Sequence, residues 1–206
     1  MSDFLYMVTT RIEEAYEEDF NRWQGDIHCP ALMTLPGYWS VSRWHSLDQE
    51  HMYTNLWHIR DKAAFDNPRR RKLAMDPEGV RLDPFRHRSI KFFTRDGDGL
   101  SAPPEAENSK GCSGMLLARF SHRADLAYGI SAFFRERVLP TQDRELFLGS
   151  ALYHSFDQQE RDDSIWIGYS RVPPSELETL DDRLDRFPEH ITNAIVWQHW
   201  EAVKGI

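Results

Sequence analysis

An internal repeat is the feature that most constrains the fold of this chain. Residues 44–50 (WHSLDQE) return 109 positions later as residues 153–159 (YHSFDQQ). Other landmarks keep nearly the same offset: Pro30 and Pro140, Trp57 and Trp166, and the apolar starts at 5–8 and 115–118. In a chain of 206 residues this repeat predicts two similar units of about 100 residues, each large enough to bury its own core.

Hydrophobic patterning predicts the same order of elements in both units. In the first unit we expect a strand at 4–10, a helix at 14–26 that ends near 28–30 because of Pro30, strands at 38–46 and 51–59, a helix at 61–75 interrupted by Pro68, and a strand at 89–94. In the second unit we expect a strand at 114–120, a helix at 125–137, strands at 150–156 and 164–169, a helix at 175–186 and a strand at 194–203.

This βαββαβ order is the ferredoxin-like motif, so the predicted fold class is α+β. Each antiparallel sheet carries helices on one face and leaves its other face apolar. Two such sheets would therefore bury each other by packing into a dimeric-type α/β barrel within one chain. We predict an N-terminal unit at residues 1–95, a linker at 96–113 that is rich in Gly, Pro and Ser, and a C-terminal unit at 114–206.

Charge and cysteine content argue against several classes of protein. The net charge of −8 disfavours nucleic-acid binding, which needs clustered Lys and Arg. The one basic run, residues 69–72 (RRRK), is predicted to be a solvated face. Cys29 and Cys112 form neither a disulfide framework nor a CxxC pair, which fits a reduced, cytoplasmic setting. Since we find no basic leader and no long apolar run, we expect no membrane partner.

The two units differ at one position that bears on function. The first contains residues 23–30 (WQGDIHCP) and the second contains residues 133–140 (FFRERVLP), so His28 corresponds to Val138. A residue needed only for packing would more plausibly keep a similar side chain in both copies. We therefore interpret the N-terminal unit as the working half and the C-terminal unit as the supporting half.

Three stretches of the first unit resemble the EthD-like branch of the dimeric α/β-barrel superfamily: residues 20–23 (FNRW), 27–32 (IHCPAL) and 35–37 (LPG), which leads into a strand ending at Arg43 and Trp44. The resemblance implies a pocket between each sheet and its helices, near the end of the first helix. It implies activities that include muconolactone-type isomerases, polyketide cyclases and dehydratases, cofactor-free monooxygenases and haem-binding enzymes. It also implies a role in proton transfer for His28.

His28 is the candidate catalytic residue. An imidazole titrates near neutral pH, so at a helix end over an aromatic pocket it can accept or donate a proton. The alternative is a ring N–H that caps the carbonyls of the helix. Cys29 is adjacent, but helix neighbours point about 100° apart, so we expect a buried thiol rather than a Cys/His nucleophile pair.

The predicted substrate-binding residues are six large side chains of the first unit: Tyr6, Trp23, Trp39, Arg43, Tyr53 and Trp57. Strand alternation places Trp39, Val41 and Arg43 on one side of the second strand. A guanidinium among rings suits a carboxylate, enolate or phenolate. A surface ion pair for Arg43 and core packing for the rings are the alternatives.

His45 and His154 occupy the same repeat position, so we expect both to stabilise hairpin turns. Neither an HxH nor an HExxH spacing is present and no carboxylate cluster accompanies the histidines, so no metal and no cofactor are predicted. Haem held by a histidine stays an open alternative.

These observations predict a cofactor-independent lyase, dehydratase or isomerase of aromatic-compound metabolism. His28 would act by general acid–base catalysis on a small aromatic or other apolar carbonyl-containing metabolite. One alternative is an oxygenase, cofactor-free or haem-dependent, that acts on a phenol. The other is a non-catalytic protein that binds a small molecule.

The expected partner is the small-molecule substrate, and association into a homodimer is left open. No GxGxxG, Walker or GxSxG motif points to nucleotide or serine-hydrolase chemistry.

Overall fold

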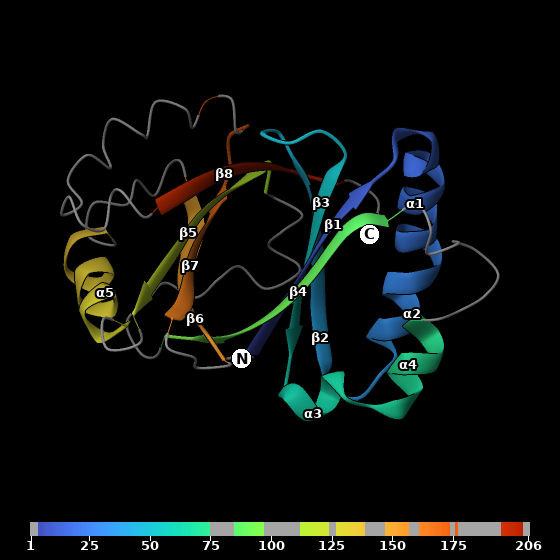
Figure 1. Ribbon diagram of the computed structural model, residues 1–206, viewed down its shortest axis with the longest axis horizontal. Helices are drawn as coiled ribbons and strands as arrows, with labels where there is room; N and C mark the ends of the chain where they lie inside the picture. The colour runs from blue at the N-terminus through green and yellow to red at the C-terminus, as the bar shows by residue number, and fades with distance from the viewer. Residues whose placement is uncertain are drawn as a thin grey trace. The chain divides into compact units, whose positions relative to one another are not determined.

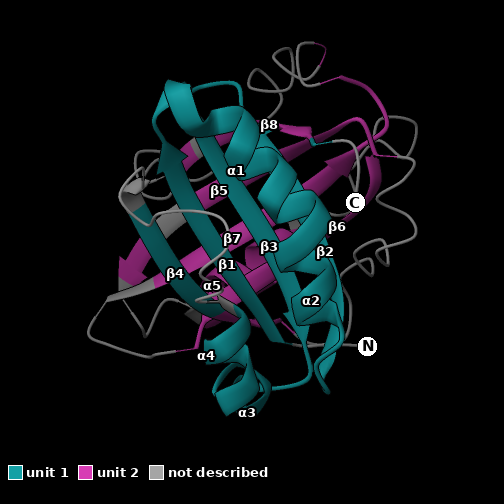
Figure 2. Cartoon of the chain, turned by 90° about the vertical axis from the view of Figure 1, so that its right-hand side faces the viewer, with its two compact units in different colours: residues 1–92, 203–206 teal, residues 93–202 magenta. Residues whose placement is uncertain are grey.

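The computed structural model describes residues 4–74, 85–96, 112–123, 127–138, 147–156, 161–173, 176 and 195–203. The hydrogen-bonded strands follow the order β1-β3-β2-β8-β5-β7-β6-β4, which is that of a closed barrel. The predicted α+β fold class with antiparallel sheets is confirmed. The chain divides into two compact units, residues 1–92 with 203–206 and residues 93–202 (Figure 2). The predicted helix at 175–186 and most of the predicted linker lie outside the described residues.

The first unit combines an antiparallel sheet with a helical layer (Figure 1). β1 (Phe4–Ile12) and β2 (Tyr38–Ser46) both pair with β3 (Met52–Ile59), so β3 lies between them. The helices are α1 (Glu17–Trp23), α2 (Cys29–Met33), α3 (Lys62–Phe65) and α4 (Pro68–Ala74). β4 (Phe85–Arg95) closes the βαββαβ order. In Figure 2, α1 and α2 run across one face of these strands.

The register of the sheet brings its large side chains together beneath the helices. Tyr6 pairs with Trp57 across β1 and β3, and Val41 pairs with the same Trp57 across β2 and β3. All three belong to one buried cluster with Leu32 of α2. Because residues two apart in a strand share a face, this register defines the face of the sheet that meets the helices.

A β-bulge changes which residues of β2 face the helices. Tyr38 pairs with Ile59 and Ser40 pairs with His58, so Trp39 is an extra residue in the ladder. Tyr38 and Val41 are buried, whereas Trp39 is 46% exposed. The prediction that Trp39 shares the face of Val41 and Arg43 is therefore wrong, because the bulge shifts the alternation by one residue.

Pro30 led us to predict that the first helix ends near His28, and this prediction is wrong. The helix continues through a π-helical turn, η2 (Gln24–His28), directly into α2. The Cys29 N–H bonds to the carbonyl oxygen of Gln24, five residues earlier, and Pro30 lies in the first turn of α2. A proline is tolerated in a first turn, where its missing N–H leaves no helical bond unmade, and the wider π-turn precedes it.

The second unit repeats these backbone features. β5 (Gly114–Arg123) pairs with β7 (Arg161–Ser170) and β8 (Ile195–Ala202), and β6 (Phe147–Ser155) pairs with the other edge of β7. Helix α5 (Ala127–Phe133) passes into a π-helix, η5 (Phe134–Val138). β6 also carries a register shift, between Phe147 and Gly149. A π-turn and a bulge thus recur at the positions that the sequence repeat makes equivalent.

Within the described part of the chain, none of the helices combines the length and the apolar character that a bilayer span requires.

Candidate functional site

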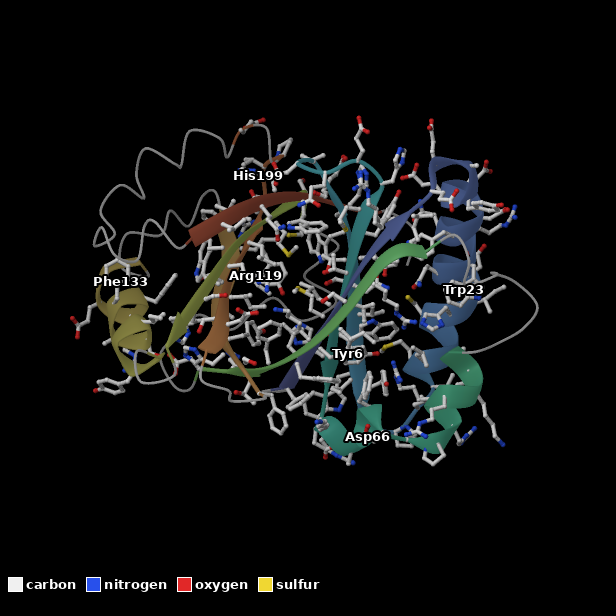
Figure 3. The ribbon with its side chains drawn as sticks, viewed as in Figure 1. Tyr6, Trp23, Asp66, Arg119, Phe133 and His199 are labelled. Atoms are coloured by element: carbon white, nitrogen blue, oxygen red, sulfur yellow. The ribbon has the colours of Figure 1, made fainter. Side chains whose placement is uncertain are left out.

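His28 lies at the last position of the π-turn, packed among aromatic rings of the first unit. It is 8% exposed. The Trp23 ring stacks on its imidazole with centroids 4.3 Å apart and planes 26° apart, and Trp57 meets it nearly edge-on at 6.3 Å. Figure 3 shows Trp23 on the side of α1 that faces the strands and Tyr6 on β1. The histidine predicted from sequence is therefore placed between the helix and the sheet.

The π-turn is fixed to the sheet by Gln24, its first residue. The Gln24 carbonyl accepts the Cys29 N–H that closes the wide turn. Its side-chain Oε1 accepts a hydrogen bond of 3.0 Å from Asn55 Nδ2 on β3. Both side chains are buried, so this bond satisfies polar groups that would otherwise be desolvated without compensation. Because Gln24 begins the turn and His28 ends it, the bond to Asn55 also fixes where the imidazole lies.

The imidazole is held neutral. Burial, which is the largest cause, and the positive charges of Arg88, Arg70 and Arg43 together lower the pKa of His28 to about 4. Its Nδ1 is buried and has no hydrogen-bond partner among the described residues. This nitrogen therefore does not cap a helix carbonyl of the described residues.

Cys29 is fully buried, and burial raises the pKa of its thiol to about 12. Its Sγ donates to Gln24 Oε1 at 3.4 Å. The thiol is therefore protonated near neutral pH, and the expectation of a buried structural cysteine is confirmed.

Two phenols lie in the same cluster. Tyr6 stacks on Trp57 with centroids 5.6 Å apart and planes 1° apart, and Tyr38 meets Trp57 edge-on at 5.8 Å. Burial raises the pKa of both hydroxyl groups, so they stay protonated and can donate hydrogen bonds. Tyr6 and Trp57 were predicted, whereas Tyr38 was missed in favour of its neighbour Trp39, because the bulge was not foreseen.

Arg70 corrects the prediction that the basic run is only a solvated face. Its Cζ lies 3.6 Å from the centre of the Phe65 ring and 5.9 Å from that of Tyr6. Its Nε is buried without a hydrogen-bond partner among the described residues. The sequence contained a signal for this orientation: Leu73, three residues on and thus on the same face of α4, packs against the buried cluster that contains Tyr6.

Arg43 and Tyr53 belong to a polar network on the α1 side of the site. Arg43 Nη2 donates to Asn21 Oδ1 at 2.6 Å, and Asn21 Nδ2 donates to the Tyr53 hydroxyl at 2.9 Å. Tyr53 in turn donates to Glu17 Oε1 at 2.6 Å, and Glu17 Oε2 lies 2.9 Å from His51 Nδ1. This network joins α1 to β2 and β3. Among the described residues Arg43 has no ion-pair partner, and the residue is only 4% exposed.

The two histidines of the repeated phrase, which we predicted to stabilise hairpin turns, have different neighbours, and the turn at residues 157–160 lies outside the described residues. The His45 ring lies 5.0 Å from that of Tyr53. His154 lies between two hydroxyls instead, with Nε2 2.9 Å from Ser131 Oγ and Nδ1 2.7 Å from Ser164 Oγ. Ser131 is on α5 and Ser164 on β7, so His154 joins a helix to the sheet. In the first unit Ser46, not the histidine, accepts the turn N–H groups of Asp48 and Gln49.

The described residues contain no group of three or more His, Cys, Asp or Glu side chains that could hold a metal ion. His28 also does not fit a haem as it is packed here. An axial ligand needs one edge of its ring open to the macrocycle, whereas His28 is 8% exposed, carries an indole against its face and has a buried Nδ1. We therefore derive no step through a haem.

Neither a family model nor a curated protein matches the sequence. Solved structures do match. An anthrone oxidase-like protein has a TM-score of 0.69 at 9% identity, over 98% of this chain and 94% of its own. A candidate monooxygenase from Fusobacterium nucleatum has a TM-score of 0.63 at 9% identity, over 98% and 92%. Chlorite dismutase from Candidatus Nitrospira defluvii has a TM-score of 0.57 at 11% identity, over 97% and 92%.

At these identities the likeness shows the fold alone. The shared fold is the dimeric α/β barrel built from ferredoxin-like units, as the sequence predicted. Almost the whole chain takes part in each match, so both units are covered by the comparison.

Proposed function

We propose that this chain is an enzyme that removes a proton from a small aromatic substrate, with His28 as the general base. The observation that carries the proposal is a neutral, buried imidazole whose Nδ1 has no hydrogen-bond partner in the part of the chain that the structure describes. A neutral imidazole can accept a proton, whereas an imidazolium cannot. The rings of Trp23, Trp57 and Tyr6 supply an apolar surface for an aromatic ligand.

The charges around His28 suit the anion that proton removal creates. The guanidinium groups of Arg70, Arg88 and Arg43 act electrostatically on the imidazole. Placed near a substrate, they would stabilise an enolate or phenolate in the same way, and the protonated Tyr6 and Tyr38 can donate hydrogen bonds to it. Such an anion is the first intermediate of isomerisation, of elimination and of cofactor-free oxygenation.

The fate of the anion separates our two candidate reactions. The lyase, dehydratase or isomerase predicted from the sequence returns a proton or expels a leaving group. The oxygenase is favoured by the fold neighbours, two of which are described as monooxygenase and anthrone oxidase-like proteins. For a ketone such as anthrone, His28 would take a proton from the ring methylene, the carbanion would pass its electrons to O₂, and the products would be the quinone and water.

Two experiments test the proposal. In D₂O without oxygen, the protein should accelerate deuterium incorporation into the methylene of anthrone, measured by NMR. His28→Gln should lower that rate by about 10²- to 10⁴-fold. His58→Gln is the matched control, because its side chain belongs to the opposite face of β3, and it should keep the rate. An unchanged rate in folded His28→Gln would remove the assignment.

With oxygen admitted, O₂ uptake and quinone formation in a one-to-one ratio would identify the oxygenase. Exchange without O₂ uptake would favour the lyase or isomerase. Thermal stabilisation by the ligand with neither exchange nor uptake would identify the third candidate, a binding protein without turnover.

The recurrence of the π-turn and the bulge supports our inference that the chain arose by internal duplication. It also supports the assignment of catalysis to the first unit, where the turn ends in His28. Membership of the EthD-like branch is a further part of this proposal, and the FNRW, IHCPAL and LPG stretches carry it.

A further inference from the structure

The positive charges of the site have no protein counter-ion among the described residues. The ion pairs of the first unit join Arg22 to Asp19, Arg60 to Asp61 and His51 to Glu17. None of these pairs includes Arg43 or Arg70, although both are at least partly buried. Burying a guanidinium without an anion costs free energy, so an anion that entered the site would stabilise this arrangement.

Arg70 is the guanidinium best placed to receive a ligand. Arg43 is held by Asn21, which binds two of its nitrogens. The Nε of each guanidinium is buried without a partner among the described residues. Arg70, however, lies against the Phe65 and Tyr6 rings, and the polar groups that it meets are the neutral hydroxyls of Tyr6 and Tyr38. A guanidinium that lies over an aromatic ring still carries its N–H groups in its own plane, where a carboxylate can accept two of them at once.

Contacts connect Arg70 to the candidate base through two rings. The Tyr6 ring lies 5.9 Å from Arg70 Cζ and 5.6 Å from the Trp57 ring, and Trp57 meets His28. An aromatic ring lying along Tyr6 and Trp57 would therefore have a cation near one end and an imidazole near the other. We propose that the site binds an aromatic carboxylate, with the Arg70 guanidinium as its counter-ion.

This inference rests on the proposed function and names its substrate class. It also bears on His28 as a base. A bound carboxylate offsets the charges of Arg88, Arg70 and Arg43, which lower the pKa of the imidazole beyond the effect of burial. The pKa of His28 then rises toward its ordinary value, and the imidazole becomes a stronger base near neutral pH. The charge that anchors the substrate would in this way also activate the residue that deprotonates it.

The test compares 4-hydroxybenzoate with 4-hydroxybenzamide, which has nearly the same shape and no charge, by calorimetric titration. The protein should bind the carboxylate at least about tenfold more tightly, which corresponds to about 1.4 kcal/mol. Arg70→Met should abolish the preference and Arg70→Lys should retain part of it. Arg71→Met is the matched control, because Arg71 is an exposed neighbour on the same helix, and it should keep the preference.

Equal affinity for the two compounds, binding of neither, or an unchanged preference in Arg70→Met would overturn the proposal. A melting curve for each variant separates lost binding from lost folding, and Arg70→Lys provides a second measurement if Arg70→Met does not fold. NMR titration of the His28 ring should give a higher pKa with saturating 4-hydroxybenzoate. If the carboxylate preference holds while deuterium exchange fails both with anthrone and with an anthrone that carries a ring carboxylate, anion binding stands and the proposed proton transfer is wrong.

Discussion

The two π-turns of this chain share a backbone form and differ in what fills it. The turn at residues 24–28 begins with Gln24, a buried amide bonded to Asn55, and ends with His28. The turn at residues 134–138 begins with Phe134, which is fully buried and lies 6.3 Å from the Trp166 ring in a stacked arrangement. The repeat thus pairs a hydrogen-bonded amide in one unit with a packed phenyl ring in the other.

The difference teaches where each unit places its buried polar groups. In the first unit the π-turn itself carries buried polar groups, Gln24 and His28, and His28 meets the tryptophan of β3. In the second unit the tryptophan packs on phenylalanine rings, and the polar contact between helix and sheet runs through Ser131, His154 and Ser164. Ser164 Oγ also lies 2.6 Å from His122 Nε2, so it lies between two imidazoles. The same backbone therefore supports a polar centre in one unit and an apolar one in the other.

The largest effect is expected when the first residue of the second π-turn, Phe134, is replaced by glutamine, the residue type at the same position of the first π-turn. Phe134→Gln removes a fully buried ring and places an amide where no polar partner matches Asn55. We expect a loss of about 3 to 5 kcal/mol in the free energy of unfolding, measured by urea denaturation. A loss below about 1 kcal/mol would mean that the second turn tolerates polar contents.

A pH series sharpens the comparison at His28. The pKa of His28 is about 4 in the folded state and 6.5 in the unfolded chain. As the pH falls, the unfolded chain therefore takes up a proton before the folded protein does. This contribution to stability is complete above pH 6.5 and is lost as the pH falls to about 4, by about 3 kcal/mol in all. His28→Gln should lose correspondingly less stability than wild type over that range in urea denaturation. Parallel curves would contradict a neutral buried imidazole.

The bond that fixes the first turn is measured by a double-mutant cycle. Gln24→Leu and Asn55→Leu each leave a buried amide without its partner and should destabilise by about 1 to 3 kcal/mol. The double variant should lose less than the sum, with a coupling energy of about 1 kcal/mol. Additive losses would show that the pair does not act together. Deuterium exchange in Gln24→Leu reports whether the position of His28 depends on this bond.

The smallest effect concerns the bulges that both units carry. Trp39 is the extra residue of the β2 bulge and is 46% exposed, so Trp39→Ala should change stability by less than about 0.5 kcal/mol. It should also leave 4-hydroxybenzoate binding unchanged. If Trp39→Ala weakens 4-hydroxybenzoate binding tenfold, Trp39 is part of the binding site, as the sequence analysis predicted.

Local patterns made much of this protein predictable. The alternation of residues in the strands and the apolar spacing of the first helix gave the order of elements, and the repeat with its single histidine pointed to His28. These signals are local because a strand and a helix each have a fixed period along the chain. Tyr6, Trp23 and Trp57 were found for the same reason, since each lies on the apolar face of its own element.

The rest depended on contacts between distant segments. The bulge that turns Trp39 outward and Tyr38 inward is a property of the register between β2 and β3. Arg70 belongs to a basic run that is otherwise exposed. Contacts with the rings of Phe65 and Tyr6 stabilise the inward orientation of its guanidinium. The π-turn, too, is held by a bond from Gln24 to another element.

The sequence by itself determined the α+β fold class and the order of the described strands and helices, and it singled out His28 as the residue in which the two repeats differ, because periodicity and repetition can be identified along the chain. Only the tertiary structure decided that this imidazole lies buried among rings and close enough to three guanidinium groups to be held neutral. Burial and charge proximity depend on distances through space, and residues 28, 43, 70 and 88 are far apart along the chain.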